Sequence, residues 1–238
     1  MGKVADLAKM IDHSILHPTF TDKDLEEGCA LALEYNVASV CVKPYAVSKA
    51  AALIKGSDVI VGCVIGFPHG NSATKVKVFE TEQAIADGAI EIDMVVNNGK
   101  VLQNDWEYVE NELKAITDAC HKGSAIVKVI FENDFLPDDS YKIKLCEICT
   151  KVGADYVKTS SGFGFVKQPN GDYNYTGATI DDLKLMKKHA GPNVNVKAAG
   201  GVRNLEQLLE VQATGAKRCG ATATKAMLDE AKKRFGDD

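Results

Sequence analysis

The sequence predicts an α/β fold, a single (β/α)8 barrel, from three observations. Eight short runs typical of β-strands alternate with amphipathic helical patterns over the 238 residues. The sequences ADGA, KVGA and ATGA come just before predicted strands, and each places a glycine where a helix ends. No G-x-G-x-x-G pattern follows the first strand, which favours the barrel over the alternative, a doubly wound sheet.

The order of these elements accounts for nearly the whole chain. The strands are expected at residues 12–16, 39–42, 59–65, 91–95, 125–130, 156–159, 195–198 and 218–220. The helical patterns cover residues 21–36, 72–89, 104–120, 137–154, 178–191, 204–216 and 223–235. No linker or shift in composition divides the chain, so residues 1–238 are expected to form one domain, with a short helix before the first strand. Residues 162–176 are the longest irregular segment, and a loop of this length usually has a function or is mobile.

Composition and charge exclude several classes of function. The net charge is −5 and the charges are interspersed, so no nucleic-acid surface is predicted. The longest apolar runs, such as VIVGCVIGF, are too short to span a bilayer, and the N-terminus MGKVADLAKM lacks the apolar core of a signal peptide. The seven cysteines lack the spacing of a disulfide framework. We therefore expect a cytoplasmic protein that binds neither nucleic acid nor membrane.

One C-x-x-C sequence, CEIC at residues 146–149, lies inside a helical pattern. A redox motif of this type is expected to open a helix after a strand. We therefore interpret these two cysteines as small residues on a helix.

Charged residues gather where the predicted strands end, which is where a barrel collects its catalytic side chains. The candidates at these ends are Asp12, His13, Cys41, Lys43, Asp93, Lys128, Glu132, Lys158 and Lys197. The five histidines are scattered without H-x-x-x-H or H-E-x-x-H spacing, so no metal site is predicted. The set is instead rich in lysines and carboxylates.

Two of these lysines occupy similar positions, Lys158 in ADYVKTSSG and Lys197 in VNVKAAGG. Lysines crowded into a barrel mouth of low dielectric repel one another's protonated forms, and burial lowers the pKa further. A neutral lysine attacks carbonyl carbons, and the Schiff base that it forms accepts electrons when a C–C bond breaks. Asp93 is the candidate for proton transfer. The alternative is a set of buried Lys–Asp pairs that only hold the barrel together.

Glycine-rich turns follow the last strands. Gly162 follows Lys158, and Gly200 and Gly201 follow Lys197 in the sequence AAGGVR. The sequence CGATATKAM begins the last helix. Backbone N–H groups at such turns and at helix N-termini bind phosphate, and barrels commonly bind it after strands seven and eight. The turns together predict a phosphorylated substrate.

Eight segments occur in a familiar order over residues 11–223: IDHSILHP, ASVCVKPY, VIGFPHG, EIDMVVNNG, VKVIFE, DYVKTSSGF, VKAAGGVR and TGAKRCGATA. On these segments the chain resembles the type I deoxyribose-phosphate aldolase family. The resemblance implies a TIM barrel that reversibly cleaves 2-deoxy-D-ribose 5-phosphate to D-glyceraldehyde 3-phosphate and acetaldehyde through a Schiff base. It implies no metal and no organic cofactor.

The resemblance also implies roles for individual residues. Lys158 would form the Schiff base, Lys197 would be the ammonium that lowers its pKa, and Asp93 would donate and accept protons. The substrate-binding residues that it implies are Asp12, Cys41, Lys128, Thr159, Gly162, Gly200, Gly201, Gly220 and Thr222.

Several expectations stay open. Ala199 and Ala223 stand where the family pattern typically has serines, and Ala223 would remove one hydroxyl from the phosphate site. The expected partners are a phosphosugar and aldehydes, with a homodimer or homotetramer possible. One alternative function is a Schiff-base aldolase of the same fold that uses a different donor. A second is a phosphosugar-binding barrel without catalysis.

Overall fold

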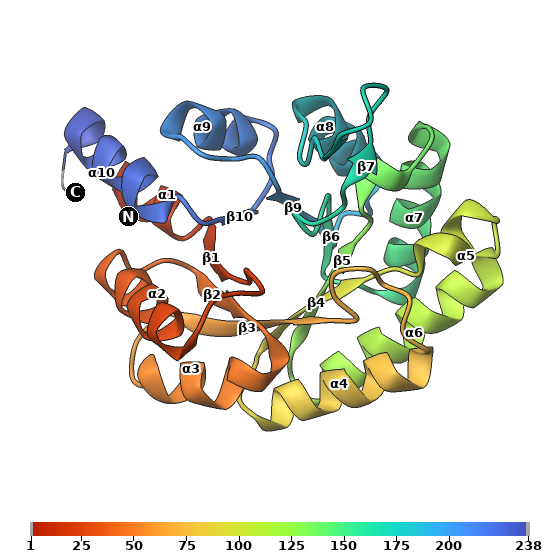
Figure 1. Cartoon of the computed structure of the whole chain (residues 1–238), viewed down its shortest axis with the longest axis horizontal. Helices are drawn as coiled ribbons and strands as arrows, with labels where there is room; N and C mark the ends of the chain where they lie inside the picture. The colour runs from red at the N-terminus through yellow and green to blue at the C-terminus, as the bar shows by residue number, and fades with distance from the viewer. Residues whose placement is uncertain (1, 237–238) are drawn as a thin grey trace.

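The computed structural model describes residues 2–236. The barrel strands are β1 (Ile11–Ile15), β2 (Ser39–Val42), β3 (Ile60–Ile65), β4 (Glu91–Val95), β5 (Ile126–Ile130), β6 (Tyr156–Lys158), β9 (Asn195–Ala199) and β10 (Arg218–Ala221). They are parallel and close in the order β1-β10-β9-β6-β5-β4-β3-β2 (Figure 1). The predicted (β/α)8 barrel is therefore confirmed, and each predicted strand lies within two residues of its observed bounds.

The helices surround the strands (Figure 1). They are α1 (Lys3–Ala8), α2 (Asp22–Glu34), α3 (Val47–Leu53), α4 (Thr74–Ala86), α5 (Asn98–Leu102), α6 (Trp106–Lys122), α7 (Asp139–Val152), α8 (Ile180–His189), α9 (Leu205–Ala213) and α10 (Thr224–Phe235). Two short 3-10 turns, η1 (Pro44–Ala46) and η2 (Asn133–Phe135), follow β2 and β5. Helix α1 packs beside α10, where the Lys3 ammonium lies 3.9 Å from the centre of the Phe235 ring. None of the helices within residues 2–236 is long and apolar enough to cross a membrane.

The hydrophobic core lies between the strands and the helices. On β5, Val127 and Val129 belong to this core, whereas Lys128 between them takes part in ion pairs inside the barrel. The same alternation holds on β9, where Val196 and Ala198 flank Lys197. Because successive side chains of a strand point to opposite faces, one face of each strand packs under the helices while the other is free to carry charges.

A buried ion pair outside the barrel fixes the end of β4. Lys77 on α4 and Glu112 on α6 are fully buried, with 3.0 Å between their charged atoms. The Lys77 ammonium also donates to the Val95 carbonyl at 2.8 Å, and Glu112 accepts from the Asn97 N–H at 3.2 Å. These bonds hold two helices to the end of the strand that carries Asp93, so they support its position.

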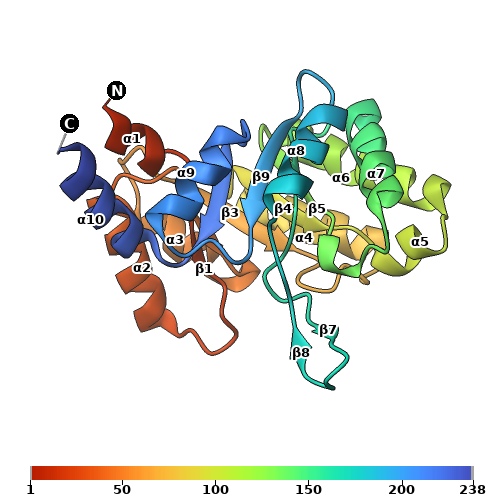
Figure 2. The same cartoon turned by 90° about the horizontal axis from the view of Figure 1, so that it is seen from above.

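Three parts of the chain differ from the sequence prediction. Helices α3 and α5 were not expected, because segments of seven and five residues are too short to show a clear helical period. Residues 162–176, expected to be irregular, contain an antiparallel hairpin of β7 (Val166–Lys167) and β8 (Tyr173–Asn174). This hairpin extends away from the barrel (Figure 2). Cys146 and Cys149 lie buried on α7, as the helical interpretation predicts.

Candidate active site

Charged side chains from six strands meet inside the barrel. They are Asp12 on β1, Glu91 and Asp93 on β4, Lys128 on β5, Lys158 on β6, Lys197 on β9 and Arg218 on β10. We call these side chains the ion network. Neighbouring strands place them at matching heights, since Asp93 pairs with Lys128 and Lys158 with Lys197 in the strand register. Residues more than one hundred positions apart are thereby brought into contact, as the 104-residue separation of Asp93 and Lys197 illustrates.

Asp93 lies at the centre of the ion network. Its Oδ2 atom accepts hydrogen bonds from Lys158 Nζ at 2.6 Å and from Lys197 Nζ at 2.7 Å. Its Oδ1 atom lies 3.1 Å from Lys128 Nζ. One carboxylate oxygen is therefore shared by the two lysines that the sequence analysis paired, and this geometry allows a proton to pass between them.

Asp12 and Glu91 complete the ion network on the side away from Lys158. Asp12 pairs with Lys197 and with Arg218, and it accepts from Lys128 Nζ at 3.2 Å. Arg218 Nη2 donates to Glu91 at 2.6 Å, and Lys128 also pairs with Glu91. Each of these cations therefore has carboxylate partners of its own besides Asp93.

The charges of the ion network do not balance when every group is ionised. It contains three carboxylates and four basic groups, and all of them are at most 3% exposed except Arg218 at 14%. Unbalanced charge in a buried site is costly, because water does not screen it. Loss of one proton makes the ion network neutral. Among residues 2–236, Lys158 has Asp93 as its only ion-pair partner, so it is the basic group that gives up its proton most easily.

The directions of the pKa shifts agree with this assignment. Burial lowers the pKa of Lys158 most strongly, the Asp93 carboxylate opposes the shift, and the Lys197 ammonium adds to it. Burial also acts against the charged form of Lys197, but Asp12 and Asp93 more than offset it and raise the pKa of Lys197. Burial opposes ionisation of Asp93 as well, yet the surrounding lysines hold its pKa well below its usual range. The pKa values of the two lysines are thus shifted in opposite directions, and burial is the largest cause of the lowered pKa of Lys158.

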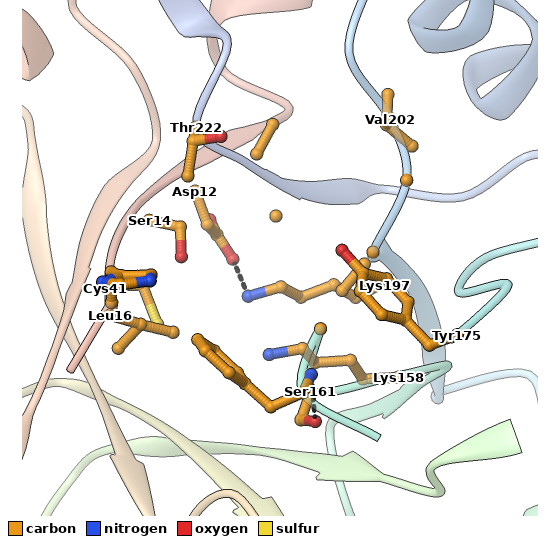
Figure 3. Close-up of a pocket in the computed structure, with 18 of the residues that line it drawn as sticks. Asp12, Ser14, Leu16, Cys41, Lys158, Ser161, Tyr175, Lys197, Val202 and Thr222 are labelled. Carbon is orange, nitrogen blue, oxygen red and sulfur yellow. Dashed lines mark hydrogen bonds and ion pairs between the residues drawn. The ribbon is translucent and has the colours of Figure 1, made fainter. Parts of the chain in front are cut away.

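A cavity of about 620 Å³ opens above the two lysines (Figure 3). The predicted site residues that line it are Asp12, Cys41, Lys158, Gly162, Lys197, Gly200, Gly201, Gly220 and Thr222. Burial raises the pKa of the Cys41 thiol to about 11, so this cysteine presents a neutral S–H group. Asp93 lies beneath the cavity, within hydrogen-bond distance of both lysines.

Two predicted substrate-binding residues do not line the cavity. Lys128 is 1% exposed and is enclosed by its carboxylate partners. The Thr159 hydroxyl donates to the Ala199 carbonyl at 3.1 Å and accepts from the Ala199 N–H at 3.0 Å. Lys128 therefore holds the carboxylates of the ion network together, and Thr159 joins the chain after β6 to the end of β9.

Glu132 also lies outside the cavity lining, although it follows β5. It has a left-handed backbone with φ of 57°, and its carboxylate accepts from the Ser161 N–H at 3.0 Å and from the Ser161 hydroxyl. Burial raises the pKa of Glu132. Because Ser161 comes three residues after Lys158, Glu132 fixes the turn that leaves the lysine.

The remaining strand-end candidates face other surroundings. His13 lies on the helix side of β1, where its Nδ1 is 2.8 Å from the Thr224 hydroxyl, and burial lowers the pKa of His13 to about 4. Lys43 donates to the backbone carbonyls of His17 and Phe20 at 3.1 and 2.9 Å. His13 therefore links β1 to the start of α10, and Lys43 holds the loop after β1. Within residues 2–236 no group of three or more His, Cys, Asp and Glu side chains is arranged to hold a metal ion.

The cavity has further lining residues that were not among the predicted site residues. They are Ser14, Leu16, His17, Pro18, Phe20, Ser161, Phe163, Phe165, Tyr175, Ala199, Val202, Arg203 and Ala221. Arg203 is the most informative of them, because it carries a permanent positive charge and follows Gly200 and Gly201 closely in the chain. It belongs to the AAGGVR segment, so its position after the two glycines could have identified it.

The loop after β9 has a backbone that suits an anion. Gly200 and Gly201 both have left-handed φ angles, of 82° and 85°. Successive N–H groups in such a turn point to one side and form a concave donor surface. A side chain at Gly200 would also collide with its surroundings, since a Cβ there would lie 3.1 Å from Gly177 Cα.

Comparisons with known proteins find similarity to aldolases. Residues 7–229 match the family model described as DeoC/LacD family aldolase. The chain is 52% identical to the deoxyribose-phosphate aldolase of Rhodopirellula baltica, over 97% of this chain and 91% of that protein. It is 48% identical to the deoxyribose-phosphate aldolase of Clostridium perfringens strain SM101, over 94% of each chain.

A solved structure has the same fold. The chain is similar to the tetrameric deoxyribose phosphate aldolase from Aeropyrum pernix, with a TM-score of 0.86 and 28% identity. The match covers 98% of this chain and 94% of that one.

Proposed function

Because this chain belongs to the DeoC/LacD family of aldolases, we propose that it reversibly cleaves 2-deoxy-D-ribose 5-phosphate to D-glyceraldehyde 3-phosphate and acetaldehyde. The observation that carries the proposal is the environment of Lys158. This lysine is buried, lines the cavity, has a lowered pKa, and shares one oxygen of Asp93 with the charged Lys197. Such a lysine is suited to form a Schiff base with an aldehyde.

The reaction begins at the aldehyde carbon of the open-chain sugar. The neutral Nζ of Lys158 attacks C1, and the resulting carbinolamine loses water to give a protonated imine. Removal of the proton from the C3 hydroxyl then breaks the C2–C3 bond. The electron pair of this bond moves to C2 and forms an enamine, while C3 leaves as the carbonyl carbon of D-glyceraldehyde 3-phosphate. Protonation of the enamine at C2 and hydrolysis of the imine release acetaldehyde and regenerate Lys158.

Asp93 and Lys197 move the protons in this sequence. Their hydrogen bond of 2.7 Å, together with the 2.6 Å bond from Asp93 to Lys158, makes a short path that ends at the reacting nitrogen. General acid–base groups placed in this way contribute about 10²- to 10⁴-fold to a rate. The protonated imine restores the fourth positive charge of the ion network, so it is a strong electron acceptor at the moment of bond cleavage.

The phosphate is proposed to bind at the far side of the cavity. The N–H groups of Gly200 and Gly201 and the guanidinium of Arg203 are the donors that the turn after β9 offers. Gly220 and Thr222 line the same cavity after β10. This arrangement separates the charged end of the sugar from Lys158 and so orients C1 toward it.

Replacement of Lys197 by leucine is expected to move the acidic limb of the pH profile of kcat/KM upward by about one to three pH units. The Lys197 ammonium lowers the pKa of Lys158, so its removal raises that pKa. Lys158 then becomes protonated and inactive at a higher pH as the solution is acidified. Lys184→Leu, at an exposed position on α8, is the control and is expected to leave the limb unchanged. An acidic limb that stays in place while the rate falls would assign Lys197 to proton transfer alone.

The proposed function is tested by turnover and by trapping. Cleavage of 2-deoxy-D-ribose 5-phosphate is measured by reduction of the aldehyde products in a coupled assay. Acetaldehyde, acetone and dihydroxyacetone are then compared as donors in the reverse reaction. A preference for acetone or dihydroxyacetone would replace the proposed donor. Binding of the sugar phosphate without turnover and without a borohydride-stable adduct would instead indicate a non-catalytic binding protein.

We also propose that residues 1–238 form one aldolase domain that works in the cytoplasm as a homodimer or homotetramer, without nucleic-acid or membrane partners. The tetrameric relative from Aeropyrum pernix supports an assembly of this kind. Exposed apolar residues on α4, Val76 at 51% and Phe79 at 66% exposure, offer a surface that assembly could cover. Sedimentation velocity of the full chain distinguishes a monomer from these assemblies.

A further inference from the structure

The β7–β8 hairpin forms one wall of the cavity. The segment that contains it leaves β6 just after Lys158 and returns to α8 beside the Gly200 turn. Phe163, Phe165 and Tyr175 from this segment line the cavity. The outer part of the hairpin extends away from the barrel (Figure 2). Tyr173 on β8 is 64% exposed. Only the base of the hairpin therefore belongs to the site.

The segment that follows β8 is fixed by hydrogen bonds to neighbouring loops. The Asp134 carboxylate accepts from the N–H groups of Thr176 and Gly177 at 2.5 and 3.0 Å. Gly177 packs directly on the Gly200 backbone, where a Cβ at position 177 would lie 2.6 Å from the Gly200 oxygen. The Ala178 N–H then donates to the same oxygen at 3.1 Å. The residue that precedes this anchored stretch is Tyr175, so its position relative to the Gly200 turn is fixed.

Phe165, just before β7, contacts the Tyr175 ring on its other side. Val166 pairs with Asn174 in the hairpin register, which makes Phe165 and Tyr175 the next cross-strand neighbours. Their rings meet edge to face, with 5.3 Å between the ring centres. Cross-strand aromatic pairs of this kind stabilise a hairpin. The Tyr175 ring is therefore held between Phe165 and the Gly200 turn.

Among the described residues, Tyr175 donates its backbone N–H to the Asn174 side chain, and its hydroxyl has no hydrogen-bond partner. Figure 3 shows the ring reaching inward from the hairpin, with its oxygen at the inner end. A Cβ at Gly200 would lie only 3.3 Å from Tyr175 Cε2, a ring carbon next to the one that bears the hydroxyl. The free O–H group thus borders the turn at which the phosphate is proposed to bind.

We propose that Tyr175, held by the β7–β8 hairpin, is a specificity-determining residue that donates a hydrogen bond from its hydroxyl to the phosphate group of the substrate. This inference rests on the proposed function and adds a donor that the strand-end loops do not provide. Ala223, where the sequence analysis noted a missing hydroxyl, does not line the cavity, whereas Tyr175 does. Lys167 on β7 also lies outside the lining.

The test compares two identical substitutions in one hairpin. Tyr175→Phe removes the proposed donor and keeps the edge-to-face contact with the Phe165 ring. Tyr173→Phe is the matched control, since it removes an exposed hydroxyl outside the cavity. The ratio of kcat/KM for 2-deoxy-D-ribose 5-phosphate to that for 2-deoxy-D-ribose is measured for each variant and for the wild type. Loss of one hydrogen bond to a charged group is expected to lower this ratio about ten- to one-hundredfold in Tyr175→Phe. Tyr173→Phe is expected to leave it unchanged.

Binding of inorganic phosphate gives a readout that does not depend on turnover. Its dissociation constant, measured by calorimetry with the full chain, is expected to rise about tenfold or more in Tyr175→Phe and to stay constant in Tyr173→Phe. An unchanged ratio and an unchanged phosphate affinity would overturn the inference. Equal losses for both sugars would also overturn it, because they would place the hydroxyl at the reacting carbons. A wild type that cleaves neither sugar would refute the proposed function, and the phosphate titration would then decide the role of Tyr175 alone.

Discussion

Replacement of Lys158 by arginine is expected to lower kcat/KM for 2-deoxy-D-ribose 5-phosphate by about four orders of magnitude or more, because the covalent route is lost. Arginine can keep a hydrogen bond to Asp93, but its guanidinium does not lose a proton in a protein and so offers no nucleophile. The substitution also removes Lys158, the basic group whose loss of a proton is expected to make the ion network neutral. Both effects act on the chemical step, so the decrease is expected in kcat.

Chemical trapping identifies the reacting nitrogen directly. Reduction with borohydride in the presence of acetaldehyde is expected to leave an ethyl group on the peptide that contains Lys158, detected by mass spectrometry. The Lys158→Arg variant is expected to give no adduct under the same conditions. An ethyl group on Lys128 or Lys197 in the wild type would contradict the assignment, since both belong to the same ion network.

Replacement of Asp93 by asparagine is expected to reduce kcat by about 10²- to 10⁴-fold with little change in KM, since a general acid–base group is removed. Asparagine has nearly the same shape and still accepts hydrogen bonds from the two lysines, but it cannot carry the proton between them. The Asp93 carboxylate also raises the pKa of Lys158. Its loss is therefore expected to move the acidic limb of the pH profile downward, opposite to the shift expected for Lys197→Leu.

Proton transfer by Asp93 can be followed separately from cleavage. Exchange of the acetaldehyde methyl protons with deuterium oxide, measured by NMR, reports formation and protonation of the enamine. This exchange is expected to slow in Asp93→Asn by a factor similar to the loss in kcat. Asp118→Asn is the control, because Asp118 is 60% exposed and pairs with Lys114 on the surface of α6. A variant with a changed KM and a normal exchange rate would show that Asp93 serves binding instead.

The barrel could be predicted because most of its strands are recognisable from the local sequence. Runs such as those of β4 and β5 are short, rich in β-branched residues and bounded by turns. The placement of Lys158 and Lys197 was also predictable, since strand order and register place residues at the same height once the barrel is recognised. The sequence thus contained both the fold and the lysine pair at its centre.

Contacts between strands that are distant in the sequence were harder to predict. Asp12 was expected among the substrate-binding residues, but its pairing with Arg218, 206 positions away, depends on closure of the barrel between β1 and β10. Glu91 was not selected at all, although it lies two residues before Asp93 on the same face of β4. The partner of a buried charge is set by geometry across the barrel, and local sequence does not specify it.

The β7–β8 hairpin was missed from the sequence for a different reason. Its strands have only two residues each, too few for an alternating pattern to be recognised. The turn residues were nevertheless informative, because Asn170 and Gly171 form the dipeptide that most favours a hairpin, and Gly171 has φ of 92°. Attention to that dipeptide would have identified the hairpin, but not the direction of the Tyr175 side chain.

The distribution of charge along the ion network has a consequence for how the chain folds. All three carboxylates belong to β1 and β4, in the first half of the chain, and all four basic groups belong to β5, β6, β9 and β10, in the second half. The first four strands alone would have to bury carboxylates without partners, which costs several kcal/mol for each ion. We therefore expect the strands of the first half to become protected from hydrogen exchange only when those of the second half do, as pulse labelling during refolding would reveal. Early protection of β1–β4 alone from hydrogen exchange would contradict this expectation. It would mean that these strands can form while water solvates their carboxylates, before the basic strands have folded.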